Sequence, residues 1–162
     1  MKITLSESEI RIATWLAKMR TDSNREAKVY DHKIGPQDGE YTDLEGMLGE
    51  MAFCKLFNVY PDLSIKPQGH SYDCNIGGLR IDVKTTRHHN GKLLASTTKS
   101  VHDCDYYVLM VGAGGTYELI GYANSKSLID EKNVIDLGHG PTYGLEQQAL
   151  RDCRLAPWYR NV

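Results

Sequence analysis

Residues 72–84 contain the pattern that most restricts the fold of this chain, because apolar and polar residues alternate on both sides of Gly77-Gly78. A Gly-Gly pair between two such stretches predicts a β-hairpin with a two-residue turn. Counting outward from the turn gives these pairs: Ile76 with Leu79, Asn75 with Arg80, Cys74 with Ile81, Asp73 with Asp82, and Tyr72 with Val83. A slip by one residue would exchange the two faces of the hairpin, so the clean separation of apolar from charged residues supports this register.

The charged face of this hairpin brings two carboxylates together, since the register sets Asp73 opposite Asp82. Cross-strand neighbours are close, and like charges placed there destabilise the pair. A shared cation explains the arrangement most simply, and carboxylate oxygens suit a hard ion such as Mg²⁺. Lys84 follows on the same face and could hold an anion or position a water molecule beside the metal. The alternative is a solvated polar face on an edge hairpin.

The composition is that of an ordinary globular protein, with 162 residues, 41% hydrophobic and 25% charged residues. We expect a single domain over residues 1–162. Nineteen Lys and Arg against 21 Asp and Glu leave a net charge of −2, which excludes a histone-like basic protein. If the protein binds nucleic acid, it must do so through a local basic patch. No apolar run reaches the length of a membrane span. Four scattered cysteines without a C-x-x-C pair, together with the lack of a signal peptide, predict a reduced, cytoplasmic protein.

The pattern of apolar residues predicts a mixture of helices and strands. The first helix begins with a Ser6/Glu9 capping box. Its expected apolar stripe consists of Ile12, Trp15, Leu16 and Met19. The strand over residues 105–111 is almost wholly apolar and is expected to be central. The Trp158-Tyr159 pair is expected to cover the core. The expected elements are helices over 6–20, 42–57, 125–131 and 145–151, a loop in the second half of 22–40, and strands over 63–66, 72–76, 79–86, 105–111 and 116–122.

The second helix carries a carboxylate among apolar residues at Glu50. Such a group is costly to bury unless it is paired or bound to a metal. Gly46 and Gly49 flank this carboxylate and would let the helix approach a sheet closely. Glu45 is the rival carboxylate, and we interpret it as the partner of Thr42 in a second capping box. For Glu50 the alternative is a helix end turned toward solvent.

These residues resemble the motif of the PD-(D/E)XK nuclease superfamily, which has the restriction-endonuclease-like fold. The matching stretches are Gly-Met-Leu-Gly-Glu50, Tyr-Asp73 and Ile-Asp82-Val-Lys84-Thr-Thr, followed by the apolar strand over 105–111. The resemblance covers residues 42–123 as a catalytic scaffold, with the first helix and the C-terminal tail as additions. It implies an α/β fold with a mixed central β-sheet flanked by α-helices. One departure is Tyr72, where the motif has proline before its first aspartate.

The resemblance implies a divalent-metal-dependent endonuclease that hydrolyses phosphodiester bonds of DNA. Glu50, Asp73, Asp82 and the Val83 carbonyl would bind Mg²⁺ or Mn²⁺. The ion would act as a Lewis acid and activate the attacking water. Lys84 would orient that water and offset charge on the reacting phosphate. Nucleases of this kind often act as homodimers or higher oligomers, so either is compatible with the sequence.

A basic patch follows the hairpin, because residues 80–102 contain five basic residues against one acidic residue. A phosphate backbone would be drawn to such a patch. The candidate nucleic-acid-binding residues are Arg80, Arg87, His88, His89, Lys92 and Lys99. The alternative is a solvated hairpin around Asn90-Gly91. Two other functions stay open: a catalytically inactive nucleic-acid-binding module of the same fold, and a non-nuclease protein with a structural polar hairpin.

Overall fold

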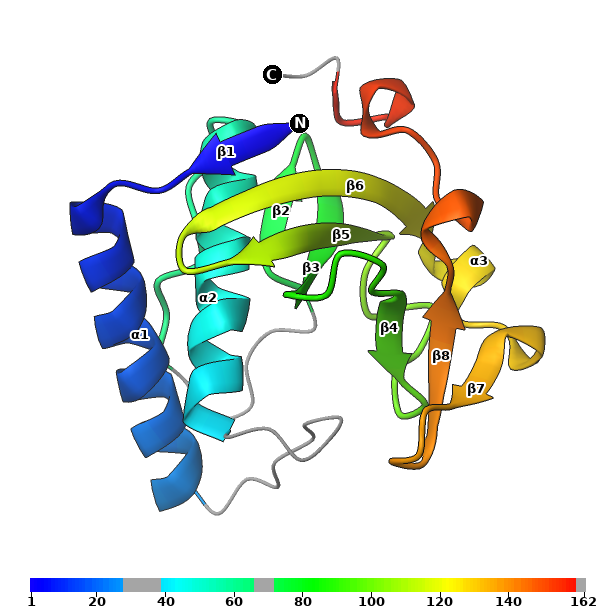
Figure 1. Cartoon of the computed structure of the whole chain (residues 1–162), viewed down its shortest axis with the longest axis horizontal. Coiled ribbons are helices and arrows are strands. Elements are labelled where there is room, and N and C mark those ends of the chain that lie inside the picture. The colour runs from blue at the N-terminus through cyan, green and yellow to red at the C-terminus, as the bar shows by residue number, and fades with distance from the viewer. Residues whose placement is uncertain (28–38, 66–71, 160–162) are drawn as a thin grey trace.

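A computed structural model describes residues 1–27, 39–65 and 72–159 of the chain. Its main sheet has the strand order β1-β6-β5-β3-β2 and is mixed, because β3 and β5 are parallel while the other neighbours are antiparallel (Figure 1). A second, antiparallel sheet has the order β4-β8-β7. The elements are β1 Lys2–Thr4, α1 Glu7–Glu26, α2 Gly39–Leu56, β2 Cys74–Ile76, β3 Leu79–Thr86, β4 Leu93–Ser96, β5 Tyr106–Ala113, β6 Thr116–Asn124, α3 Ser125–Leu128, β7 Val134–Asp136, β8 Pro141–Leu145 and the 3-10 helices Glu131–Asn133, Gln147–Ala149 and Cys153–Leu155.

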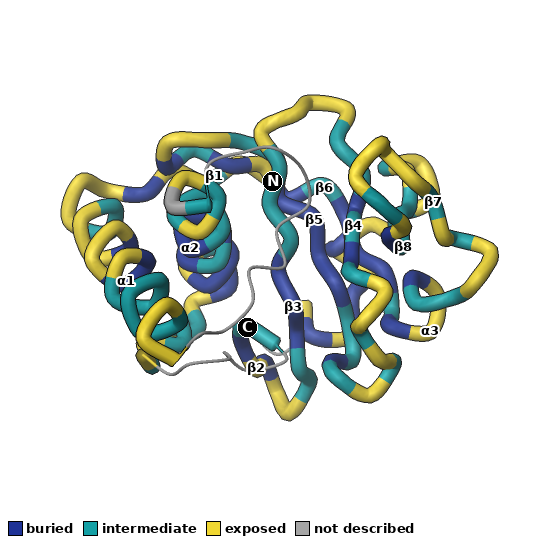
Figure 2. Tube along the Cα trace, turned by 90° about the horizontal axis from the view of Figure 1, so that it is seen from below, coloured by how far each residue is buried: buried dark blue, intermediate teal, exposed yellow. Residues whose placement is uncertain are grey.

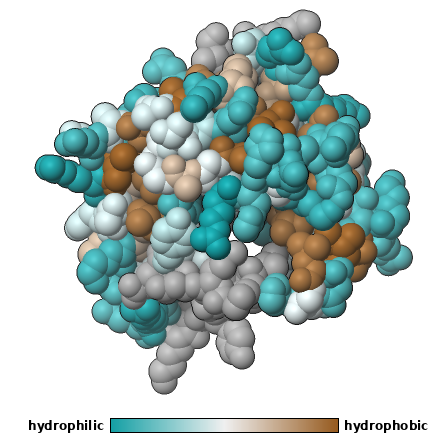
Figure 3. Space-filling model, in the orientation of Figure 1, coloured by the Kyte–Doolittle hydropathy of each residue, from teal (hydrophilic) through white to brown (hydrophobic). Residues whose placement is uncertain are grey.

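The main sheet lies between two unlike layers, with α1 and α2 on one face and the small sheet on the other (Figure 2). Each interface has its own apolar core. Strand β5 supplies both, since Val108 and Met110 pack toward the helices while Tyr107 and Leu109 pack toward the small sheet. This alternation is why its sequence is almost continuously apolar. The face seen in Figure 3 is mostly hydrophilic, with one hydrophobic area over the small sheet and other hydrophobic areas elsewhere on that face.

The α/β class and the mixed sheet with β5 at its centre are confirmed. The expectation that helices flank this sheet holds for one face only, because the small sheet covers the other. Its strands are short and lack the long alternation that would mark them in the sequence, and none of β4, β7 and β8 was predicted. None of the helices in the described residues has the length and hydrophobicity needed to cross a lipid bilayer.

The hairpin register is confirmed from Cys74 to Ile81, but it ends two pairs earlier than predicted, because the pairs Asp73–Asp82 and Tyr72–Val83 are not formed. The N–H of Asp73 donates to the carbonyl of Ile81, 2.9 Å away, although Ile81 is already the partner of Cys74. Asp73 and Cys74 therefore both face Ile81, as at a β-bulge. The alternation of side chains between the two faces of the hairpin changes at this point. Asp73 is not directly opposite Asp82, and Tyr72 packs against the core of the small sheet instead of sharing a face with Cys74.

The first helix begins as predicted. Ser6 caps it, with both hydrogen bonds of the capping box to Glu9 present. The helix continues to Glu26, beyond its predicted end at residue 20, although residues 21–24 are weak helix formers.

The apolar stripe expected on this helix is correct for Leu16 but wrong for Ile12 and Trp15. Its buried residues are Ala13, Leu16 and Ala17, which face the core beside α2. Ile12 and Trp15 are 48% and 57% exposed. Alanines allow two helices to approach closely, so the buried line follows the small side chains and not the largest ones.

The second capping box is wrong, because α2 begins at Gly39 and encloses Thr42 within the helix. Glu45 serves a different structural purpose. Its Oε2 accepts a hydrogen bond from the Tyr117 hydroxyl at 2.6 Å, and its Oε1 accepts one from the Gly114 N–H at 3.2 Å. Glu45 therefore ties α2 to the turn between β5 and β6, which no local pattern could indicate.

Several further predictions fail in the type or in the length of the element. Residues 63–65 form no strand, while 66–71 and 28–38 lie outside the described residues. The latter range includes most of the loop predicted for the second half of 22–40. The helix expected over 125–131 stops at Leu128, and the one over 145–151 is a single 3-10 turn, Gln147–Ala149. Trp158 is fully buried and covers the core as expected, whereas Tyr159 is 38% exposed.

The contact between α2 and β3 depends on Gly49. A Cβ atom at this position would lie 1.9 Å from Oγ1 of Thr85, far closer than van der Waals contact allows. The predicted role of Gly49 in close approach is therefore confirmed. Gly46 does not share it, since a Cβ there would meet no atom within 4 Å. Gly49 is what allows the helix that carries Glu50 to lie directly on β3.

We expect Gly49→Ala to lower the free energy of unfolding by about 1–3 kcal/mol, because the added methyl group forces α2 away from β3. Gly46→Ala is the matched control, and it should raise that free energy by roughly 0.5–1 kcal/mol through helix propensity alone. Urea denaturation of both variants measures these changes. If both substitutions change the free energy of unfolding equally, the close approach of α2 to β3 at Gly49 is contradicted.

Candidate functional site

The predicted residues meet around one edge of β3. Strand β2 pairs with β3 only up to Ile81, and no strand of the described residues continues along that edge. The carboxylate of Asp73 lies there instead, and its Oδ2 accepts the N–H of Val83 at 2.6 Å. Within a strand, the N–H and C=O of one residue leave on the same side. The carbonyl of Val83 therefore faces the same edge as Asp73.

Asp82 points away from the helices, because its neighbours Ile81 and Val83 belong to the core beneath α2 and successive strand residues alternate. Its side chain is only 3% exposed and lies between two ammonium groups. Lys84 Nζ is 2.7 Å from Oδ1, and Lys99 Nζ is 3.0 Å from Oδ2. The contact to Lys99 is a hydrogen bond, whereas Oδ1 is buried without any hydrogen bond of acceptable geometry.

Glu50 reaches the site from α2. Its side chain is 17% exposed, and its Oε2 is 3.2 Å from Nη1 of Arg20. Burial raises the pKa of Glu50 to about 7, although the neighbouring Arg20 guanidinium acts in the opposite direction. The Glu50 side chain is thus largely buried and is not turned toward solvent, as expected, and the guanidinium compensates part of its charge.

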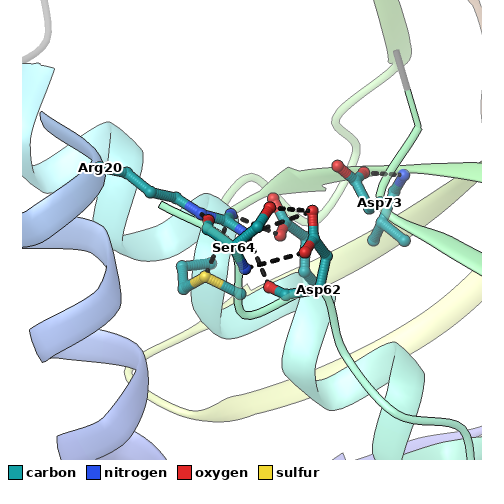
Figure 4. A network of polar contacts seen from close by, with 7 residues as sticks. Arg20, Asp62, Ser64 and Asp73 are labelled. Atoms are coloured by element: carbon teal, nitrogen blue, oxygen red, sulfur yellow. Dashed lines mark hydrogen bonds and ion pairs between the residues drawn. The ribbon is translucent and has the colours of Figure 1, made fainter. Parts of the chain in front are cut away.

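Arg20 joins α1 to the site through a network of polar contacts (Figure 4). Its Nη2 donates to the carbonyl of Asp62 at 2.6 Å, and its Nε donates to the carbonyl of Ser64 at 3.2 Å. Sequence reasoning missed this residue. The available signal was its position on α1, four residues after Leu16, which places it on the buried side of the helix.

The three carboxylates of the site affect one another electrostatically. Burial raises the pKa of Asp73 well above its usual range, and the charges of Glu50 and Asp82 raise it further. Burial alone would lower the pKa of Lys84, but the negative charges of Asp82 and Asp73 outweigh it and raise that pKa. Charge repulsion among buried carboxylates favours the binding of a cation or a proton.

The donor atoms present fit a hard divalent ion in their chemistry. They are carboxylate oxygens and one strand carbonyl, and the buried Oδ1 of Asp82 has no hydrogen bond. Within the described residues, however, no three His, Cys, Asp or Glu side chains are grouped closely enough to hold an ion. Lys84 and Lys99 contact Asp82 where a bound cation would lie.

The predicted basic patch is divided by the structure. Arg80 is bound to Asp105, with Nη2 3.1 Å from Oδ1, and it also donates to the carbonyl of His102. Lys92 forms an ion pair with Glu146. Lys99 belongs to the Asp82 cluster, so it is a residue of the centre rather than of an outer surface.

The other three residues of that patch, Arg87, His88 and His89, are exposed on the turn that follows β3. This turn is well supported, because the side-chain amide of Gln147 donates to the carbonyls of His89 and Gly91 at 2.8 and 2.9 Å. The exposed side chains are consequently presented from a backbone that is held in place.

Comparisons with models of protein families, with curated proteins and with solved structures find no match to this chain.

The protonation of Glu50 should affect stability in the absence of divalent ions. Its folded-state pKa of about 7 exceeds the ordinary value of 4.5, so the folded protein binds this proton more tightly than the unfolded chain does. The resulting stabilisation is fully present below pH 4.5 and is lost as the pH rises through about 7. Glu50→Gln should flatten this dependence, leaving only the similar contribution of Asp73. The test is the free energy of unfolding, measured by urea denaturation across this pH window with a chelator present. If this free energy depends on pH in the same way in the wild type and the variant, the role of Glu50 is contradicted.

Proposed function

We propose that this protein is a divalent-metal-dependent nuclease of the PD-(D/E)XK type that hydrolyses phosphodiester bonds in DNA. The observation that carries the proposal is the meeting of Asp73, Asp82 and Lys84 at the open edge of β3, with Glu50 delivered by the helix beneath. Glu50 comes from α2, whereas the other three residues belong to the hairpin region. Their electrostatic coupling supports one common site.

The order of the elements supports the restriction-endonuclease-like fold. The helix with the glutamate precedes the hairpin with the two aspartates and the lysine, and β5 lies parallel to β3 on its other side. The small sheet and the long first helix are additions around this arrangement.

In the proposed site, Asp73, Asp82, Glu50 and the Val83 carbonyl would hold Mg²⁺ or Mn²⁺. The ion would supply Lewis-acid chemistry for the hydrolysis of the phosphodiester. The protein positions these oxygens by the Val83–Asp73 hydrogen bond and by the Arg20–Glu50 ion pair. Lys84 offsets the negative charge that grows on the phosphoryl oxygens in the transition state.

The exposed turn with Arg87, His88 and His89 would contact the DNA backbone through charge and hydrogen bonds. A homodimer would provide the two sites that cutting both strands of a duplex requires. Four free, buried cysteines fit a reducing, cytoplasmic location.

The experiment that tests the function is cleavage of a panel of linear and branched DNAs with Mg²⁺ or Mn²⁺. Wild-type protein should cleave at least one substrate, and Asp82→Asn and Glu50→Gln should each reduce the rate on the order of 100-fold or more by removing a ligand charge.

The matched control is Glu45→Gln, which lies on the same helix and keeps an oxygen to accept from Tyr117. Its cleavage rate should stay near that of the wild type. DNA binding without any cleavage would favour the inactive nucleic-acid-binding module. If the protein neither binds nor cleaves DNA, the result favours a non-nuclease protein with a structural polar hairpin.

Lys84→Ala tests the mechanism. If Lys84 acts on the reacting phosphate, the single-turnover rate should fall on the order of 100-fold, because the lost interaction belongs to the transition state. DNA affinity measured with Ca²⁺ should change little. Arg87→Ala should behave oppositely, with weaker binding, a smaller salt dependence and a nearly preserved rate in the bound complex. If Lys84→Ala cleaves DNA at the wild-type single-turnover rate when it is saturated with DNA, Lys84 has no role in the reaction.

A further inference from the structure

The turn between β3 and β4 is held by residues from a distant part of the chain. The side-chain amide of Gln147, just after β8, donates to the carbonyl of His89 at 2.8 Å and to the carbonyl of Gly91 at 2.9 Å. An amide nitrogen has two hydrogens, so both are used on the same turn. Lys92, where the turn ends, forms an ion pair with Glu146, the residue before Gln147. Two neighbouring residues beside the small sheet therefore fix the path of this turn at three points.

The backbone of the turn is also closed from within. A Cβ atom at Gly91 would lie 2.4 Å from Cγ2 of Thr86 and 2.9 Å from the carbonyl oxygen of His88, so the chain passes closely over itself. The N–H of Gly91 donates to that same carbonyl at 2.8 Å, and the N–H of His88 donates to Oγ1 of Thr86 at 3.2 Å. The contacts of Gln147 are added to a turn that is already compact.

The side chains of this turn are left available for a ligand. Arg87, His88 and His89 are exposed, and in the part of the chain that the structure describes no group forms an ion pair or hydrogen bond with their side chains. Because Gln147 donates to backbone carbonyls, it holds the turn without using the side-chain donors that a phosphate would need. The turn is therefore held through its backbone and presents its charge outward.

This turn directly continues the strand that carries the proposed catalytic residues. Arg87 follows Lys84 by three residues, which is about 10 Å along an extended strand. At a rise of about 3.4 Å per nucleotide, this distance corresponds to a phosphate about three nucleotides from the bond on which Lys84 would act. The position of the turn therefore affects how a DNA strand lies across the site.

We propose that Gln147 is a positioning residue for DNA binding, which fixes the β3–β4 turn so that Arg87, His88 and His89 meet a phosphate near the scissile one. This inference rests on the proposed nuclease function and gives the small sheet a purpose, which is to hold the DNA-contacting turn in its bound shape before DNA arrives. Such preorganisation increases affinity, because less conformational entropy is lost on binding.

The test combines two measurements on the full chain. DNA affinity is measured by fluorescence anisotropy with a labelled duplex in Ca²⁺, and the single-turnover cleavage rate is measured in Mg²⁺ at saturating DNA. Gln147→Met keeps the length of the side chain, removes both donors and adds no charge. We expect DNA binding to weaken about 5-fold and the rate to stay within about 2-fold of the wild type. Gln148→Met is the matched control on the exposed neighbouring residue, and it should bind DNA as the wild type does.

A double-mutant cycle with Arg87→Ala separates positioning from general damage. If Gln147 acts by presenting Arg87, Gln147→Met should weaken binding by only about 2-fold in the Arg87→Ala background, because the two effects share one cause. A merely structural role would give the same loss in both backgrounds. Gly91→Ala disturbs the same turn without changing Gln147, so it should show the same pattern and gives a result even if Gln147→Met does not fold.

The outcomes separate the two proposals. Weaker DNA binding by Gln147→Met or Gly91→Ala, with a preserved rate and a smaller effect in the Arg87→Ala background, supports the positioning role. Wild-type affinity in these variants, or equal losses in the two backgrounds, overturns it, while cleavage by the wild type leaves the nuclease function standing. A wild type that neither binds the duplex nor cleaves DNA overturns both.

Discussion

The burial of one negative charge organises this protein. Asp82 lies in the main sheet between a helical layer and a small sheet, with its side chain 3% exposed. A carboxylate in such a position is unfavourable unless positive charge compensates it. Lys84 from β3 and Lys99 from the turn after β4 provide that charge. The ion pairs therefore link the two sheets at the place where the proposed chemistry would occur.

The second determinant is the early end of the hairpin. Because the β2 ladder stops at Cys74, the N–H of Val83 is left for the Asp73 carboxylate, and the open edge of β3 becomes polar. On the other face, Gly49 allows α2 to approach closely enough to bring Glu50 to the same edge. A bulge and a missing Cβ atom thus bring together carboxylates from a helix and from the hairpin.

The local parts of this arrangement could be predicted. The Gly77-Gly78 turn determines the hairpin register, and the capping box marks the start of α1, since both depend on residues within a few positions of each other. Two of the predictions that depended on distant partners failed. The binding of Arg80 by Asp105 closed part of the expected basic patch. The contact of Glu45 with Tyr117 replaced the expected cap.

The sequence by itself determined the hairpin, the α/β class and the residues Glu50, Asp73, Asp82 and Lys84 as a candidate set, because alternation and turn chemistry act over short distances. Only the tertiary structure decided that Arg20 pairs with Glu50 and that Lys99 lies on Asp82. Arg20 is 30 residues from its partner and Lys99 is 17 residues from its partner. Charge compensation between such positions depends on how α1 and the small sheet pack around β3, and no local pattern in the chain encodes that packing.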